Sequence, residues 1–153
     1  MPIDAAHLHL ALTHLPVIGA PLLLLVLTIG LLRGWNEVVT VALALTVGLA
    51  AVTGVVYLTG EPAEELVERA AWFSEPLTEV HEERAAVALA ATVVTGIVAL
   101  AALLLRSKGR WLGRLTWAGL LVSTVLLGWT AWTGGLIRHD EIRSAPGTEA
   151  PRS

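Results

Sequence analysis

The fold is decided by residues 7–33, HLHLALTHLPVIGAPLLLLVLTIGLLR, where three histidines lead into an aliphatic run that ends at an arginine. The uncharged part of this stretch, residues 15–32, is about long enough to cross a bilayer as a helix. Three similar runs follow at residues 38–60, 85–105 and 115–137. Hydrophobic residues make up 55% of the 153 positions, too apolar for an ordinary soluble domain. The sequence therefore predicts an all-α fold, one integral membrane four-helix up-and-down bundle over residues 1–143.

The connections between the apolar runs differ in length. Residues 33–37 and 107–113 are short and make their flanking spans antiparallel neighbours. Residues 61–79 form the only long connection, in which Pro62 can open a helix and Leu66, Ala70 and Phe73 recur at helical spacing. We expect a short amphipathic interfacial helix there, between spans two and three. The tail at 144–153, rich in Ala, Pro, Gly and Ser, is expected to be disordered.

Charge separates the two ends of the predicted bundle. Residues 33–37 and 106–114, at the end with the short connections, carry five basic residues against the single acid Glu37, and the other end holds the other twelve of the thirteen acids. Basic residues near span ends mark the cytoplasmic side, and the turn at 106–114 is the densest basic segment. This pattern favours a multi-pass protein of the bacterial inner (cytoplasmic) membrane with both termini extracytoplasmic.

All five histidines fall at the acidic end. His7, His9 and His14 precede the first run, His81 precedes the third, and His139 follows the fourth. A helical rise of about 1.5 Å per residue puts His9, His81 and His139 about 36 to 38 Å from the basic surface, with His14 about two turns deeper. The chain has no cysteine, so histidine and carboxylate are the strong ligands left. Imidazoles gathered at one depth indicate a haem or metal site.

A haem b needs two neutral imidazoles that face each other from different helices. The first and third helices of an up-and-down bundle face across its core, which favours a pair from spans one and three, led by His14 and His81. His139 with His9 or His7 could form a second pair, although His7 is the weakest candidate. The cofactor is then haem b or, alternatively, a copper, iron or zinc ion held by His9, His14, His81 and His139. Arg84 and Arg138 could meet haem propionates, and Glu61, Glu82 or Asp140 could hold a ring nitrogen.

The two predicted hairpins share a sequence pattern. Spans two and four end in an aromatic residue followed by Thr-Gly, as Tyr57-Leu58-Thr59-Gly60 and Trp132-Thr133-Gly134. Spans one and three are both entered past a histidine. If an axis along the membrane normal relates the hairpins, His14 and His81 take equivalent places.

The stretch His9-Leu10-Ala11-Leu12-Thr13-His14-Leu15-Pro16 resembles the opening of a family of small four-span bacterial membrane proteins of unknown function. Members typically begin His-Pro, two variable residues, then Val-His-Phe-Pro. Their third span also begins with a histidine, matched by His81, and Gly-Gly followed by a basic residue and a histidine closes the fourth, matched by Gly134-Gly135 and Arg138-His139. The similarity covers most of residues 9–143, but the proline after the first histidine is missing here, and Thr13 and Leu15 replace Val and Phe. Some relatives are fused to a Rieske iron–sulfur domain, so the resemblance implies membrane electron transfer and favours His9 over His7.

The leading hypothesis is a haem b or metal protein that exchanges electrons with quinol or a periplasmic redox protein. The alternative is a cofactor-free accessory or assembly subunit, packed in a homo-oligomer or a larger membrane complex among the membrane lipids. A transporter is weaker, because no Asp, Glu, Lys or Arg lies in the middle of a span. No residue set resembles a hydrolytic triad, a phosphate loop or a nucleic-acid surface, so electron transfer or an accessory role is favoured over a stand-alone enzyme.

Overall fold

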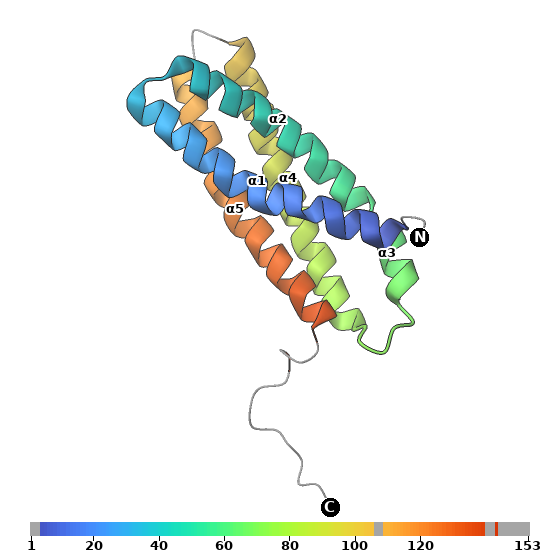
Figure 1. Cartoon of the computed structure of the whole chain (residues 1–153). Coiled ribbons are helices and arrows are strands. Elements are labelled where there is room, and N and C mark those ends of the chain that lie inside the picture. Colours follow the sequence, from blue (N-terminus) through green and yellow to red (C-terminus); the bar gives the residue numbers. More distant parts are fainter. Residues whose placement is uncertain (1–3, 106–108, 140–142, 144–153) are drawn as a thin grey trace, which may run out of the picture.

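The computed structural model describes residues 4–105, 109–139 and 143, and in this part the secondary structure is entirely helical. The helices are α1 (Ala5–Arg33), α2 (Asn36–Leu58), α3 (Gly60–Val67), α4 (Glu75–Leu104) and α5 (Gly109–Arg138) (Figure 1). Four segments, of which the second runs from α2 through α3, are long and apolar enough to cross a membrane, as the sequence predicts, and this indicates a multi-pass membrane protein. The tail expected to be disordered lies outside the described residues.

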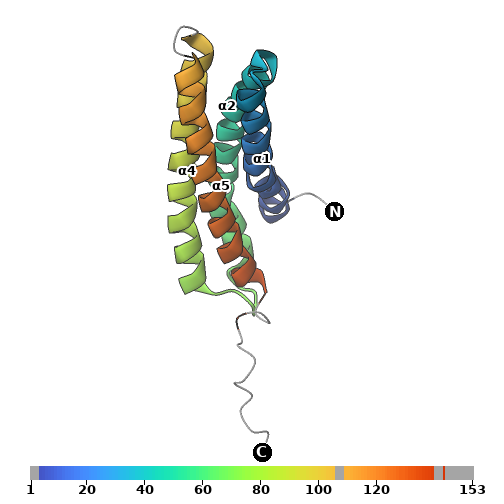
Figure 2. The same cartoon turned by 90° about the vertical axis from the view of Figure 1, so that its left-hand side faces the viewer.

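The long helices pack in a ring. α1 contacts α2 and α5, and α4 contacts the same two helices, so in the described residues α1 and α4 lie at diagonal corners. Figure 2 shows the α1–α2 hairpin beside the α4–α5 hairpin. The expectation that the first and third long helices face across the core is therefore confirmed. Side chains that α1 and α4 turn inward approach one another from opposite corners.

Local signals set the helix ends that matter for the site. α1 begins after Asp4, whose carboxylate accepts a hydrogen bond from the backbone N–H of His7. It ends at Gly34, whose φ of 69° lies in the left-handed region that glycine adopts readily. Ser74 precedes α4, with Pro76 in its first turn, where a missing N–H costs no helical hydrogen bond.

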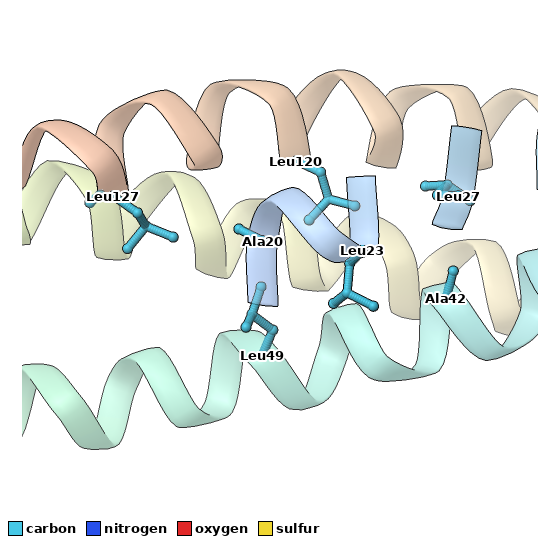
Figure 3. Packing of buried hydrophobic residues seen from close by; sticks show 8 residues of the cluster. Ala20, Leu23, Leu27, Ala42, Leu49, Leu120 and Leu127 are labelled. Carbon is cyan, nitrogen blue, oxygen red and sulfur yellow. The ribbon is translucent and has the colours of Figure 1, made fainter. Parts of the chain in front are cut away.

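The core is aliphatic and closely packed. Ala20, Leu23 and Leu27 of α1 meet Leu49 of α2 and Leu120 of α5 (Figure 3). Small residues bring the helices together elsewhere, as in membrane bundles generally. A Cβ at Gly96 of α4, for example, would lie 2.6 Å from the Cβ of Ala50 on α2.

The connection between α2 and α4 contains α3, which follows α2 directly and ends earlier than the periodicity suggested. Leu66 is exposed and Ala63 is buried, while Glu64 is half-buried and lies close enough to Glu82 of α4 for their charges to interact. α3 thus turns an acid, as well as a small apolar residue, toward its neighbours.

Candidate functional site

The histidines meet at one end of the bundle. In Figure 1 the start of α1, the helix α3, the start of α4 and the end of α5 lie at the same end, opposite the starts of α2 and α5. His7, His9 and His14 belong to α1, His81 to α4, and His139 follows α5. What differs among them is the direction in which each ring points.

His9 is half-buried over the junction of α2 and α3. Its Nδ1 donates to the carbonyl oxygen of Val56 at 3.2 Å and to Oγ1 of Thr59 at 3.0 Å. Thr59 in turn donates its hydroxyl to the same Val56 oxygen at 2.7 Å. Because a carbonyl only accepts, Nδ1 carries the ring proton, and the lone pair of the neutral imidazole is on Nε2.

His81 makes the corresponding contact in the other hairpin. Its ring is half-buried, and its Nδ1 donates to the carbonyl oxygen of Thr130 on α5 at 3.1 Å. A Cβ at Gly134 would lie 3.2 Å from Cε1 of this ring. The same reasoning therefore puts the proton on Nδ1 and the lone pair on Nε2.

The two acceptor carbonyls share a local pattern. Val56 lies three residues before Thr59 and four before Gly60, and Thr130 lies three before Thr133 and four before Gly134. In a helix the residue at i+4 stands over the carbonyl of residue i, so a glycine there leaves that oxygen open to a second donor. The Thr-Gly repeat noted in the sequence thus marks the carbonyl that accepts the histidine hydrogen bond in each hairpin.

The structure brings His9, not His14, to the place equivalent to that of His81. His9 and His81 come from diagonal helices, and their imidazoles lie close enough for their charges to interact. His14 is exposed and donates its Nδ1 to Leu10 of its own helix at 2.8 Å. Five residues separate it from His9, so it points about 140° away around α1. The expected equivalence of His14 and His81 is therefore replaced by that of His9 and His81.

His7 contributes to the start of α1. It lies on the same exposed face as His14, and its Nδ1 is 2.7 Å from Oδ1 of Asp4. Hydrogen bonds from the backbone N–H and the ring of His7 hold the pKa of the Asp4 carboxyl below its usual value. His7 thus stabilises the helix start and faces away from His9.

The end of α5 is tied to the connection that precedes α4. The guanidinium of Arg138 stacks on Trp72 at 5.0 Å, and that of Arg143 donates to the carbonyl oxygen of Trp72 at 2.7 Å. Arg143 also donates to the last carbonyls of α5, those of Leu136 at 2.6 Å and Ile137 at 2.5 Å. His139 follows this helix end, exposed, with its backbone N–H bonded to Gly135 at 3.0 Å. Sequence reasoning missed Arg143, since no local pattern pairs it with Trp72.

Arg84 lies one turn after His81, between α4 and α5. Its guanidinium carbon is 4.2 Å from the ring centre of Trp129, and it donates to the hydroxyl of Thr133. The side chain is half-buried. Arg84 and Arg138, the two expected propionate partners, therefore each rest on a tryptophan.

The ligand geometry separates haem from a small metal ion. Among the described residues, no group of three or more histidine or acidic side chains could hold an ion, so the four histidines do not converge on one centre. A zinc site draws three or four ligands from the protein, whereas a b-type haem needs only two, because the porphyrin supplies the others. Backbone carbonyls, rather than Glu61 or Glu82, hold the two rings, and Asp140 lies outside the described residues. His9 and His81, each held by a backbone carbonyl, make two imidazoles, the number of protein ligands that a b-type haem needs.

Comparison with known proteins finds no match, whether with family models, curated proteins or solved structures.

Proposed function

We propose that this protein is a haem b protein of the bacterial inner membrane, in which His9 and His81 would hold the haem near the extracytoplasmic surface. It would pass electrons between quinol and a periplasmic redox protein. One observation carries the proposal: two half-buried imidazoles come from diagonal helices, and each donates its Nδ1 proton to a backbone carbonyl. This tautomer keeps Nε2 available for iron and makes the ring a better ligand.

The chain's own residues would orient these ligands. Val56 and Thr130 supply the carbonyls, and Thr59 gives the His9 ring a second acceptor. Bound haem supplies one-electron chemistry, while the aliphatic core below it excludes water. Arg138 is exposed at the aqueous end, and we assign it the contact with a propionate. We further propose that α3 lies along the membrane interface, with exposed Leu66 toward lipid.

An absorption spectrum tests this function. We expect the full chain, purified in detergent from haem-supplemented cells, to be red, with a Soret band that shifts on dithionite reduction. His9→Ala and His81→Ala should each lose the low-spin spectrum. His14→Ala is the matched control, because it removes an exposed imidazole from the same helix as His9.

Two results would overturn the proposal. If His14→Ala removed the spectrum as completely as His9→Ala, the ligand assignment would be wrong. A colourless protein that contained no metal would favour the accessory role instead. A colourless protein with stoichiometric copper, iron or zinc would favour an ion site.

A further inference from the structure

The α4–α5 seam carries an arginine inside an apolar surface. On α4, Val80 and Val87 lie one turn before and after Arg84, and both are exposed. On α5 the neighbouring exposed residues are Val125, Trp129 and Trp132. In a membrane such a surface faces lipid, because its side chains are exposed on the outside of the bundle.

The Arg84 guanidinium is fixed in place. Trp129 holds its face at 4.2 Å, and the buried hydroxyl of Thr133 accepts one of its N–H groups. The ion pairs within the described residues are His7 with Asp4 and Arg69 with Glu68, so no carboxylate there pairs with Arg84. A guanidinium that is fixed in an apolar surface and still has unused N–H donors favours an anion that carries apolar chains.

Position along the helix identifies that anion. Arg84 directly precedes the apolar run 85–105, at the level where a helix leaves the hydrocarbon. Phospholipid phosphates lie at this level, and tryptophans such as Trp129 and Trp132 are typical of it. Val87 and Val125 continue from Arg84 toward the middle of the bundle, along the direction of an acyl chain.

We propose that Arg84, held by Trp129 and Thr133, binds the phosphate of a phospholipid in the leaflet at the histidine end. The acyl chains lie along Val87 and Val125. This inference does not depend on the proposed haem, and it assigns Arg84 to a lipid rather than to a propionate.

Lipid binding to the full chain, purified colourless from cells grown without added haem, tests the proposal. Thermal unfolding in a phosphate-free maltoside detergent is followed as phosphatidylglycerol, phosphatidylcholine, diacylglycerol or inorganic phosphate is added. Both phospholipids should stabilise the protein, whereas diacylglycerol and inorganic phosphate should not. Arg84→Gln should weaken phospholipid binding about tenfold, the usual loss for one charged hydrogen-bonding partner.

Arg69→Gln is the matched control, since its side chain is 93% exposed and has only a distant contact with Glu68. It should bind phospholipid like the unchanged protein. Thr133→Val keeps the charge but loosens the guanidinium, so a smaller loss than for Arg84→Gln is expected even if Arg84→Gln folds poorly.

The other outcomes overturn the proposal. Equal stabilisation by diacylglycerol would make the surface a site for acyl chains alone, and equal stabilisation by inorganic phosphate would make it a soluble-anion site. If Arg84→Gln bound phospholipid as well as the unchanged protein, Arg84 would not be part of the binding site. If Arg84→Gln weakened haem binding but not phospholipid binding, Arg84 would be a propionate partner instead.

Discussion

We predict that Gly134 sets the position of the His81 ring. A methyl group added at Gly134 tests how closely the ring packs against this residue. In Gly134→Ala the new Cβ would lie 3.2 Å from Cε1 and 3.5 Å from Nδ1 of His81. Ordinary contacts of this kind begin at about 3.5 Å, so the ring must move by a few tenths of an ångström. The His81 hydrogen bond to Thr130 is already 3.1 Å long, near the upper end of the normal range, and the shift weakens it.

The magnitude follows from two opposing effects. Replacing a helical glycine by alanine stabilises a helix by up to about 1 kcal/mol, and overpacking costs about 1 to 3 kcal/mol. Gly135→Ala is the matched control, because a Cβ there meets no atom within 4 Å among the described residues outside its own stretch of helix. We expect Gly134→Ala to be less stable than Gly135→Ala by about 1 to 2 kcal/mol. Gly60→Ala, whose Cβ would lie 3.8 Å from the His9 ring, should disturb its histidine less.

The assay is reversible unfolding of the three variants in detergent micelles, together with haem titration of each. Haem affinity should fall about tenfold in Gly134→Ala, as for other changes that disturb the hydrogen bond orienting a ligand, and should be unchanged in Gly135→Ala. Equal stability and equal haem affinity of these two variants would refute the reasoning, because the Gly134 contact would then not define the His81 position.

The remaining predictions concern the second ring, the helix packing and the first cap. Thr59→Val removes one of two hydrogen-bond acceptors of the His9 ring and should lower haem affinity about tenfold in a titration. Thr40→Val, which loses a hydrogen bond to Asn36 of its own helix at the opposite end of the bundle, should not lower it. Gly96→Ala should lower the free energy of unfolding by about 1 to 3 kcal/mol, because its Cβ meets Ala50. Gly48→Ala, whose Cβ meets no described side chain within 4 Å, should not lower it in the same denaturation experiment. Asp4→Ala should lower the protection of the His7 amide against hydrogen exchange, measured relative to the intrinsic exchange rate at each pH. In the unchanged protein this protection should be lost only as the pH falls through the lowered pKa of Asp4, because the carboxylate is the capping form. Protection that is insensitive to both changes would contradict the assignment of Asp4 as the cap.

The long helices could be predicted because their cause is local. Each apolar run is long enough to span a bilayer by itself, and the short turns force neighbouring helices to run antiparallel. The diagonal placement of α1 and α4 then follows from the order of the chain.

The direction of each histidine could not be predicted, because α1 is apolar on every side. Among its residues, Leu22 and Leu25 are exposed while Leu23 and Leu27 are buried, although all are leucines. A helix without a polar face does not indicate which side turns inward, so the sequence favours His14 over His9 as the partner of His81, whereas the structure turns His9 inward and leaves His14 exposed. The same holds for Trp117 of α5, whose indole N–H donates to the hydroxyl of Thr28 on α1 at 2.7 Å, a contact that no local pattern in the sequence marks.

One signal in the sequence does separate the histidines once its physical meaning is known. A helical carbonyl normally accepts one hydrogen bond from its own helix, and the side chain one turn later covers it. At Val56 and Thr130 that later residue is a glycine, so each carbonyl can also accept a hydrogen bond from an imidazole across the helix interface. The repeated Thr-Gly therefore predicts two open carbonyls at one end of the bundle. His9 and His81 donate to them, and because both rings donate from Nδ1, both keep an Nε2 lone pair, which is the atom that the proposed haem would use.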